Sequence, residues 1–269
     1  MAEPFFRMLE MVVPPLVELN GPHLTMDGLA NIPEHGGALI ALNHTSYVDW
    51  YPASIAAYRR RRRLRFMIKA EMAEVPIVGF VIKRIQLIPV DRAAGADAYA
   101  VAVQRLKDGE LVGLHPEATI SRSFELREFK TGAARLARAA DVPIIPTIVW
   151  GAQRIWTKDH PKKLWRNKIP VLVKMGQPLR AADSIEQTTA ELRRAMTDLL
   201  DQAQRQYPHP AGAFWVPRRL GGGAPTMAEA LQLREAELAE RARKRAQRAA
   251  READGPWWRR AVARAGRGR

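Results

Sequence analysis

A histidine and an aspartate five residues apart follow an apolar run of the chain. The segment is Asn43-His44-Thr45-Ser46-Tyr47-Val48-Asp49, and it comes directly after Ala38–Leu42. A neutral imidazole can take a proton from a hydroxyl that attacks a carbonyl, while a carboxylate on its other nitrogen fixes the tautomer. For the pair alone, a surface histidine near the first turn of a helix is the simpler interpretation.

Three further segments of the chain carry polar residues or an apolar run at positions that could belong to the same site. The first ends in Asp91-Arg92, the second is His115-Pro116-Glu117-Ala118-Thr119-Ile120-Ser121, and the third is Val142-Pro143-Ile144-Ile145-Pro146. Open α/β sheets bind ligands at the carboxyl ends of their strands, where an arginine such as Arg92 can hold a phosphate bidentately. An ion pair between Arg92 and a neighbouring carboxylate is the alternative interpretation.

Together the four segments resemble the glycerolipid acyltransferase family, the lysophosphatidic acid acyltransferases and their relatives. The family pattern is N-H-x4-D, a block ending in D-R, then F-P-E-G-T-R-S, then V-P-[IV]-x-P, and the resemblance covers Leu24 to Gln177. It implies acyl transfer from acyl-CoA or acyl carrier protein to a hydroxyl of a lysophospholipid such as 1-acyl-glycerol-3-phosphate, in phospholipid biosynthesis. His44 would be the base and Asp49 its orienter, with no covalent acyl-enzyme and no cofactor.

The resemblance also implies an acceptor and phosphate site. Its substrate-binding residues would be Arg92, Glu117, Thr119, Ser121 and Arg122. Two positions depart from the family pattern, because Ala118 replaces a glycine and Ile120 replaces the arginine that binds the acceptor phosphate. Two interpretations follow: Arg122 or Lys130 supplies the missing cation, or the acceptor is a glycolipid or another molecule without phosphate at that position.

Other catalytic classes are disfavoured by what the sequence lacks. The remaining histidines, at positions 23, 35, 115, 160 and 209, are scattered and predict no cluster, so no metal site is expected. There is no Gly-x-Ser-x-Gly elbow for a serine hydrolase. The absence of cysteine excludes disulfides, thiolate metal sites and a cysteine nucleophile.

Short apolar runs alternate with helical stretches, which predicts an α/β fold with a mixed β-sheet flanked by helices. The predicted strands are Leu24–Leu29, Ala38–Leu42, Arg65–Ile68, Gln86–Val90, Glu110–Leu114, Ile144–Trp150 and Val171–Met175. The predicted helices are Asp49–Tyr58, Pro76–Lys83, Ala96–Leu106, Thr131–Ala140 and Ser184–Gln204.

The chain of 269 residues divides by composition into three parts. Residues 1–207 form the predicted acyltransferase domain, and residues 208–225, which include Gly221-Gly222-Gly223, form a predicted linker. Residues 226–269 form a basic C-terminal extension, helical over Thr226–Ala250, with Thr226 as the cap and Glu229 three residues on.

The formal net charge of +15 is unevenly spread along the chain. Between Arg241 and Arg269, eleven basic and two acidic residues give +9, which leaves +6 for the other 240 residues. The excess suits an anionic membrane surface or a nucleic acid, and a compositional bias toward arginine accounts for it too. No nucleic-acid-binding motif is present, so we expect no nucleic acid partner.

Membrane contact is expected to be peripheral, from the cytoplasm, on the inner face of the plasma membrane. No apolar stretch approaches the ~20 residues that span a bilayer, and the N-terminus lacks a secretory signal. Residues Phe5–Leu19 could lie on a membrane or pack on the domain, and Trp257-Trp258 beside basic residues suits an interface. Arg59–Arg63 could grip headgroups or the phosphates of coenzyme A, or form a solvated helix end.

Overall fold

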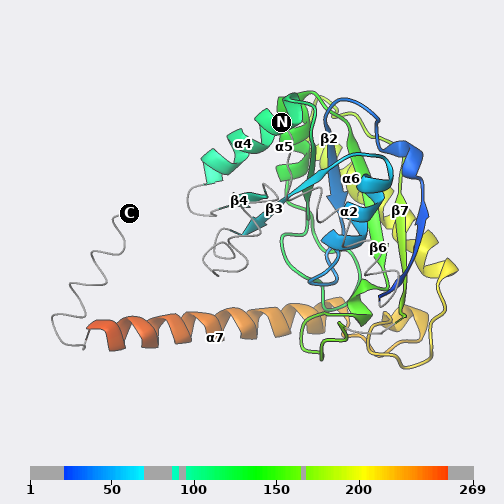
Figure 1. Ribbon diagram of the computed structural model, residues 1–269. Coiled ribbons are helices and arrows are strands. Elements are labelled where there is room, and N and C mark those ends of the chain that lie inside the picture. The colour runs from blue at the N-terminus through cyan, green and yellow to red at the C-terminus, as the bar shows by residue number, and fades with distance from the viewer. Residues whose placement is uncertain (1–20, 70–86, 91–94, 165–167, 254–269) are drawn as a thin grey trace. The chain divides into compact units, whose positions relative to one another are not determined.

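The fold is built on one seven-stranded mixed sheet. The computed structural model describes residues 21–69, 87–90, 95–164 and 168–253 (Figure 1). The strands are β1 (His23–Asp27), β2 (Ala38–Leu42), β3 (Leu64–Lys69), β4 (Ile88–Val90), β5 (Leu111–Leu114), β6 (Ile144–Trp150) and β7 (Pro170–Met175). Their order is β1-β7-β6-β2-β5-β3-β4, with β6 and β7 antiparallel and the other neighbours parallel. The predicted α/β class and all seven predicted strands are confirmed.

The described helices follow the strands along the chain, and those that end before residue 207 pack on the sheet. They are α2 (Trp50–Arg59), α4 (Gly95–Lys107), α5 (Gly132–Ala140), α6 (Ile185–Gln206) and α7 (Met227–Ala253), with 3-10 turns η1 (Leu29–Asn31), η3 (Ala152–Arg154) and η4 (Arg218–Leu220). The predicted helix at Pro76–Lys83 lies outside the described residues. None of the helices that the structure describes is long and apolar enough to cross a membrane.

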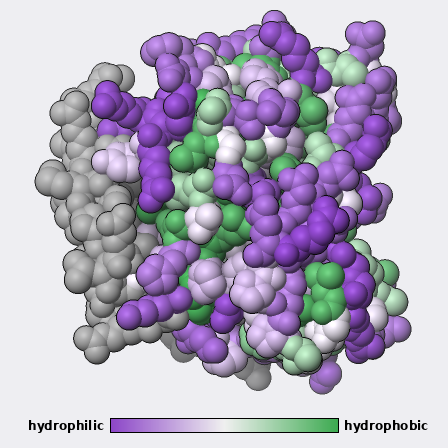
Figure 2. All heavy atoms as spheres, turned by 90° about the vertical axis from the view of Figure 1, so that its right-hand side faces the viewer, coloured by the Kyte–Doolittle hydropathy of each residue, from purple (hydrophilic) through white to green (hydrophobic). Residues whose placement is uncertain are grey.

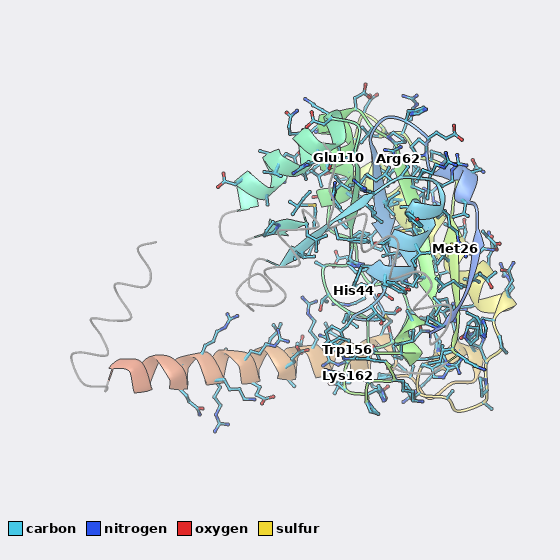
Figure 3. The ribbon with its side chains drawn as sticks, in the orientation of Figure 1. Met26, His44, Arg62, Glu110, Trp156 and Lys162 are labelled. Atoms are coloured by element: carbon cyan, nitrogen blue, oxygen red, sulfur yellow. The ribbon has the colours of Figure 1, made fainter. Side chains whose placement is uncertain are left out.

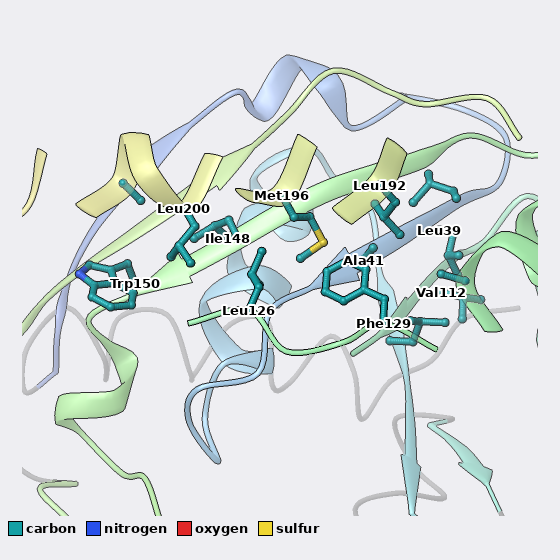
Figure 4. Close-up of a cluster of buried hydrophobic side chains, with 14 of the residues drawn as sticks. Leu39, Ala41, Val112, Leu126, Phe129, Ile148, Trp150, Leu192, Met196 and Leu200 are labelled. Atoms are coloured by element: carbon teal, nitrogen blue, oxygen red, sulfur yellow. The ribbon is translucent and has the colours of Figure 1, made fainter. Parts of the chain in front are cut away.

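The central strand β2 is buried on both faces, and its side chains divide between two cores. Leu39 and Ala41 join the cluster under α4, α5 and α6, which includes Leu136 and Met196 (Figure 4). Ala38, Ile40 and Leu42 join the cluster under α2. This alternation is the period of two expected of a strand, and a fully apolar run is what a strand buried on both faces requires.

The edge strand β1 is shorter than predicted. We expected the strand to reach Leu29, but it ends at Asp27 because Gly28 adopts a φ of 74°. A side chain at Gly28 would place its Cβ 2.0 Å from the carbonyl oxygen of Met175, so only glycine fits this turn. Figure 2 shows the side of the molecule on the right of Figure 1, where hydrophilic side chains surround smaller hydrophobic areas.

The segment 208–225 is a folded part of the first unit, which differs from the predicted linker. That unit runs to Ala224, and Trp215, Val216 and Ala224 are buried in the core under α6. The guanidinium of Arg154 lies over the ring of Trp215, 4.8 Å from the centroid of that ring. The glycines suggested flexibility, but Gly222 instead fits against the backbone of Val216.

Residues from Pro225 onward form the second unit, whose described part is the helix α7. The predicted cap at its start is confirmed. Thr226 Oγ1 accepts a hydrogen bond from the Glu229 amide at 3.2 Å, and the Glu229 carboxylate accepts one from the Thr226 amide at 2.8 Å. This is a reciprocal capping box.

Candidate active site

The predicted catalytic residues His44 and Asp49 follow β2, whose carboxyl end lies between those of two neighbouring strands. Strands β5, β2 and β6 are parallel neighbours, so the segments that follow them meet at one edge of the sheet. Asn43 fixes the start of this edge, since its side-chain amide donates to the Val149 carbonyl at 3.0 Å and accepts from the Val149 amide at 2.7 Å. The side chain thereby extends the β2 ladder by one step and holds His44 just beyond it.

Asp49 closes the loop between β2 and α2 with a single oxygen. Its Oδ2 accepts hydrogen bonds from the backbone amides of Thr45 at 2.8 Å and Ser46 at 2.7 Å, and lies 3.3 Å from His44 Nδ1. Asp49 is fully buried, whereas the His44 side chain is 21% exposed. The predicted pairing of His44 with Asp49 is thus present, and it is made through Nδ1 of the ring.

Burial controls the charge of Asp49. It raises the pKa of this carboxyl to about 7, while nearby His115 and the amides of Ser46 and Thr45 act in the opposite direction. Near neutral pH, Asp49 therefore changes between a neutral acid and the carboxylate that stabilises an imidazolium at His44.

His115 stacks on His44, a contact that the sequence interpretation missed. The two ring centroids lie 3.9 Å apart with an interplanar angle of 16°, so His115 belongs to the site around His44. His115 Nδ1 lies 2.9 Å from the Asn43 carbonyl and 3.1 Å from the Leu42 carbonyl, which assigns the ring proton to Nδ1. Burial, together with the neighbouring His44, lowers the pKa of His115 to about 3, so its ring stays neutral.

Packing explains why an aromatic ring belongs at position 115. Phe66 of β3 also stacks near His115, with centroids 6.0 Å apart, and Gly113 of β5 leaves room for the Phe66 ring. The family pattern F-P-E-G-T carries an aromatic residue at this position, which was the signal in the sequence. His115 keeps the planar ring and adds two hydrogen bonds to the β2 backbone.

Glu117 faces the backbone and holds the same loop. Its Oε1 accepts from the His44 amide at 2.8 Å and its Oε2 from the Arg127 amide at 2.9 Å, and the residue is buried. Burial raises the pKa of Glu117 to about 8, against the effect of these two amides. Both oxygens that a substrate-binding role would need are therefore engaged within the chain.

The other predicted binding residues divide between internal contacts and places that the structure does not describe. Ser121 is buried, donating its amide to the His44 carbonyl at 2.7 Å and its hydroxyl to the Glu125 carbonyl at 2.7 Å. Arg122 donates through Nε to Asp159 at 2.5 Å. Thr119 is partly exposed, and Arg92 lies outside the described residues.

The backbone at Ala118 shows what the family's glycine does at this position. Its φ is 58°, the left-handed region that a glycine adopts without penalty. The second departure, Ile120, is 5% exposed and belongs to the buried residues of the fold. The block after β5 thus keeps a glycine-like turn but carries an apolar residue where the family carries its phosphate-binding arginine.

The arginine run at Arg59–Arg63 serves the opposite edge of the sheet. Arg62 donates to the carbonyls of Pro33 at 2.5 Å, Gly36 at 2.7 Å and Gly109 at 2.7 Å, and Gly109 precedes β5 whereas the catalytic edge follows it. Arg60 pairs with Glu34 at 2.9 Å. Figure 3 shows Arg62 and Glu110 well apart from His44. Within the described ranges, no three His, Asp or Glu residues form a group that could hold a metal ion.

Comparisons with known proteins point to one family. The family model described as Acyltransferase matches residues 23–150. The 1-acyl-sn-glycerol-3-phosphate acyltransferase of Bacillus subtilis (strain 168) is 29% identical over 173 residues, 64% of this chain and 81% of that protein. The chloroplastic 1-acyl-sn-glycerol-3-phosphate acyltransferase LPAT1 of Arabidopsis thaliana is 26% identical over 154 residues, 56% of this chain and 42% of that protein.

One solved structure shares the fold. The 1-acyl-sn-glycerophosphate (LPA) acyltransferase PlsC from Thermotoga maritima superposes with a TM-score of 0.62 at 20% identity, covering 76% of this chain and 81% of that one. All four sequence segments fall within the residues that the family model matches.

We expect Ala118→Gly to stabilise the protein, because glycine relieves a left-handed conformation that costs an L-residue about 1 kcal/mol. For a unit of this size the melting temperature should rise by roughly 2–4 °C, measured by differential scanning calorimetry. Ala139→Gly, at an exposed helical position of α5, is the matched control and should lower it. A fall in melting temperature for Ala118→Gly would contradict the strained turn.

We expect His115→Phe to reduce the sensitivity of the fold to acid. His115 has a lowered pKa in the folded protein, so between pH 6.5 and about 3 the unfolded chain binds a proton that the folded chain does not. The free energy of unfolding therefore decreases as the pH is lowered through this range. Relative to the wild type, the variant should gain about 1.4 kcal/mol per pH unit below pH 6, measured by urea unfolding. A pH-independent difference between the two proteins would refute the buried neutral ring.

Proposed function

Because the chain belongs to the glycerolipid acyltransferase family, whose members are O-acyltransferases, we propose that it acylates a lysophospholipid such as 1-acyl-glycerol-3-phosphate in phospholipid biosynthesis. The donor is the thioester of acyl-CoA or acyl carrier protein. The relatives named above support the acceptor class. The observation that carries the proposal is the partly exposed imidazole of His44, whose Nδ1 lies 3.3 Å from the buried Asp49 carboxyl.

The proposed reaction moves the acyl group directly from the thioester sulfur of the donor to the hydroxyl oxygen of the acceptor. With Nδ1–H directed at Asp49, His44 accepts the acceptor's hydroxyl proton at Nε2 as that oxygen attacks the thioester carbonyl. The carbon–oxygen bond forms, the carbon–sulfur bond breaks, and the imidazolium returns its proton to the leaving thiolate. Asp49 stabilises the imidazolium between these two steps, as the carboxylate of a catalytic triad does.

The surrounding residues contribute position to this chemistry. Glu117 and Ser121 bind the amide and the carbonyl of His44, respectively, so the backbone of the base is held from both sides. His115 supports the plane of the ring by stacking. A base held in place lowers the activation free energy more than a mobile one, because the entropy of orienting it is lost during folding and not in the transition state.

The acceptor determines where the enzyme works. A lysolipid is anchored in a bilayer, so the proposed enzyme acts as a peripheral protein on the inner face of the plasma membrane, supplied with donor from the cytoplasm. The basic second half of α7 suits such an anionic surface, since Arg241, Arg243, Lys244 and Arg245 are exposed.

We expect His44→Gln to lower kcat for acyl transfer by about 10²–10⁴-fold, the usual contribution of a general base. Glutamine keeps a polar side chain of similar size but cannot accept the proton. The measurement is release of free thiol from acyl-CoA with 1-acyl-glycerol-3-phosphate as the acceptor. His35→Gln, at an exposed histidine, is the control and should retain full activity. An active His44→Gln enzyme would sink the mechanism.

The charge of Asp49 should set the acid side of the pH profile. Because the pKa of Asp49 is about 7, its carboxylate becomes protonated as the pH falls through 7. The carboxylate is the proposed active form, so kcat/KM should decrease over the same pH range. A protonated-carboxyl infrared band, isolated as the wild type minus Asp49→Asn difference, should titrate over the same range. If that band is absent at pH 5, Asp49 remains ionised and the assignment is wrong.

A further inference from the structure

A surface of two aromatic rings and a lysine lies beside His44, and nothing in the mechanism above uses it. Tyr47, in the loop that carries His44, is 42% exposed, and its ring contacts Trp156 with centroids 4.8 Å apart. The ammonium of Lys162 lies 4.3 Å from the centroid of the Trp156 ring. Figure 3 shows His44, Trp156 and Lys162 succeeding one another along one part of the molecule.

Hydrogen bonds fix this surface to the catalytic loop. The Trp156 carbonyl accepts from the Ser46 hydroxyl at 2.6 Å and from the Tyr47 amide at 3.0 Å. The Thr157 hydroxyl donates to the Thr45 carbonyl at 2.7 Å. The segment after β6 is therefore held against three consecutive residues that follow His44, from Thr45 to Tyr47.

Among the described residues, neither Ile120 nor Arg122 offers a cation at the position of the family's arginine. Ile120 is buried and apolar where the family carries arginine. The Arg122 side chain is only 10% exposed and pairs with Asp159 at 2.5 Å. A lysophospholipid that places its hydroxyl at His44 still needs a partner for its phosphate, because an unpaired phosphate loses its hydration without compensation.

We propose that Tyr47, Trp156 and Lys162 form the subsite for the acceptor headgroup, with Lys162 binding the phosphate and the rings lining the path of the glyceryl ester. The inference rests on the proposed function. An ammonium over a ring keeps its outward N–H groups available, and lysine suits a phosphate monoester as a compact charge with three donors. The exposed Tyr47 and the partly exposed Trp156 beside it suit a ligand that is polar at one end and apolar at the other.

Binding without the acyl donor tests the subsite apart from turnover. Calorimetry would compare hexanoyl-glycerol-3-phosphate with hexanoyl-glycerol, which lacks the phosphate. We expect Lys162→Ala to weaken binding of the phosphate-bearing ligand by about tenfold, the scale of one charge-assisted hydrogen bond, without changing binding of the neutral ligand. Lys162→Arg should restore most of the loss. Lys107→Ala, at an exposed lysine before β5, is the matched control and should bind both ligands as the wild type does.

Three results would overturn the subsite. The first is failure of the wild type to bind the phosphate-bearing ligand, and the second is an equal change in the binding of both ligands by Lys162→Ala. The third is a loss by Lys162→Ala that appears only in sedimentation with phosphatidylglycerol vesicles, which would assign Lys162 to the bilayer surface. Lys162-dependent binding in a protein that shows no His44-dependent transfer would support the subsite while rejecting the proposed function. The two ideas therefore fail separately.

Discussion

One carboxylate oxygen organises this end of the molecule. Oδ2 of Asp49 receives two backbone amides and faces the ring of His44, all within a loop of six residues, and the Asp49 side chain itself is buried. The same contacts that close the loop therefore aim the imidazole and place the first turn of α2. Because Asp49 is buried, its partners must be supplied by the chain, and removing any one of them leaves a charge or a dipole unpaired.

The site also contains a second buried acid with a different task. Glu117 gives both oxygens to backbone amides from two segments, so it acts as a crosslink between the loops after β2 and β5. Asp49 instead shares one oxygen with a ring that can change protonation. Burial raises the pKa of both carboxyls, to about 7 and about 8, yet only Asp49 lies with an oxygen against the ring of His44.

The sequence was informative wherever the signal was local. Alternating or fully apolar runs predicted the seven strands, and the five-residue spacing of His44 and Asp49 predicted a pair that a single loop could close. The stacking of His44 and His115 could not be predicted in the same way, because it requires β2 and β5 to be neighbours with Ala41 opposite Leu114. The segment 208–225 was misjudged because its glycines suggest a linker, while Trp215 and Val216 decide its burial.

The departures from the family pattern all fall in the turn after β5, and the structure separates them by consequence. His115 retains the planar contact with the base, and Ala118 retains the left-handed turn at a cost in strain. Both preserve geometry. Ile120 differs in kind, since a buried apolar side chain stands where the family pattern has an arginine. On the proposed function, a chain that keeps His44, Asp49 and their supports without that arginine holds the acceptor differently, with the proposed Lys162 from another loop as the cation.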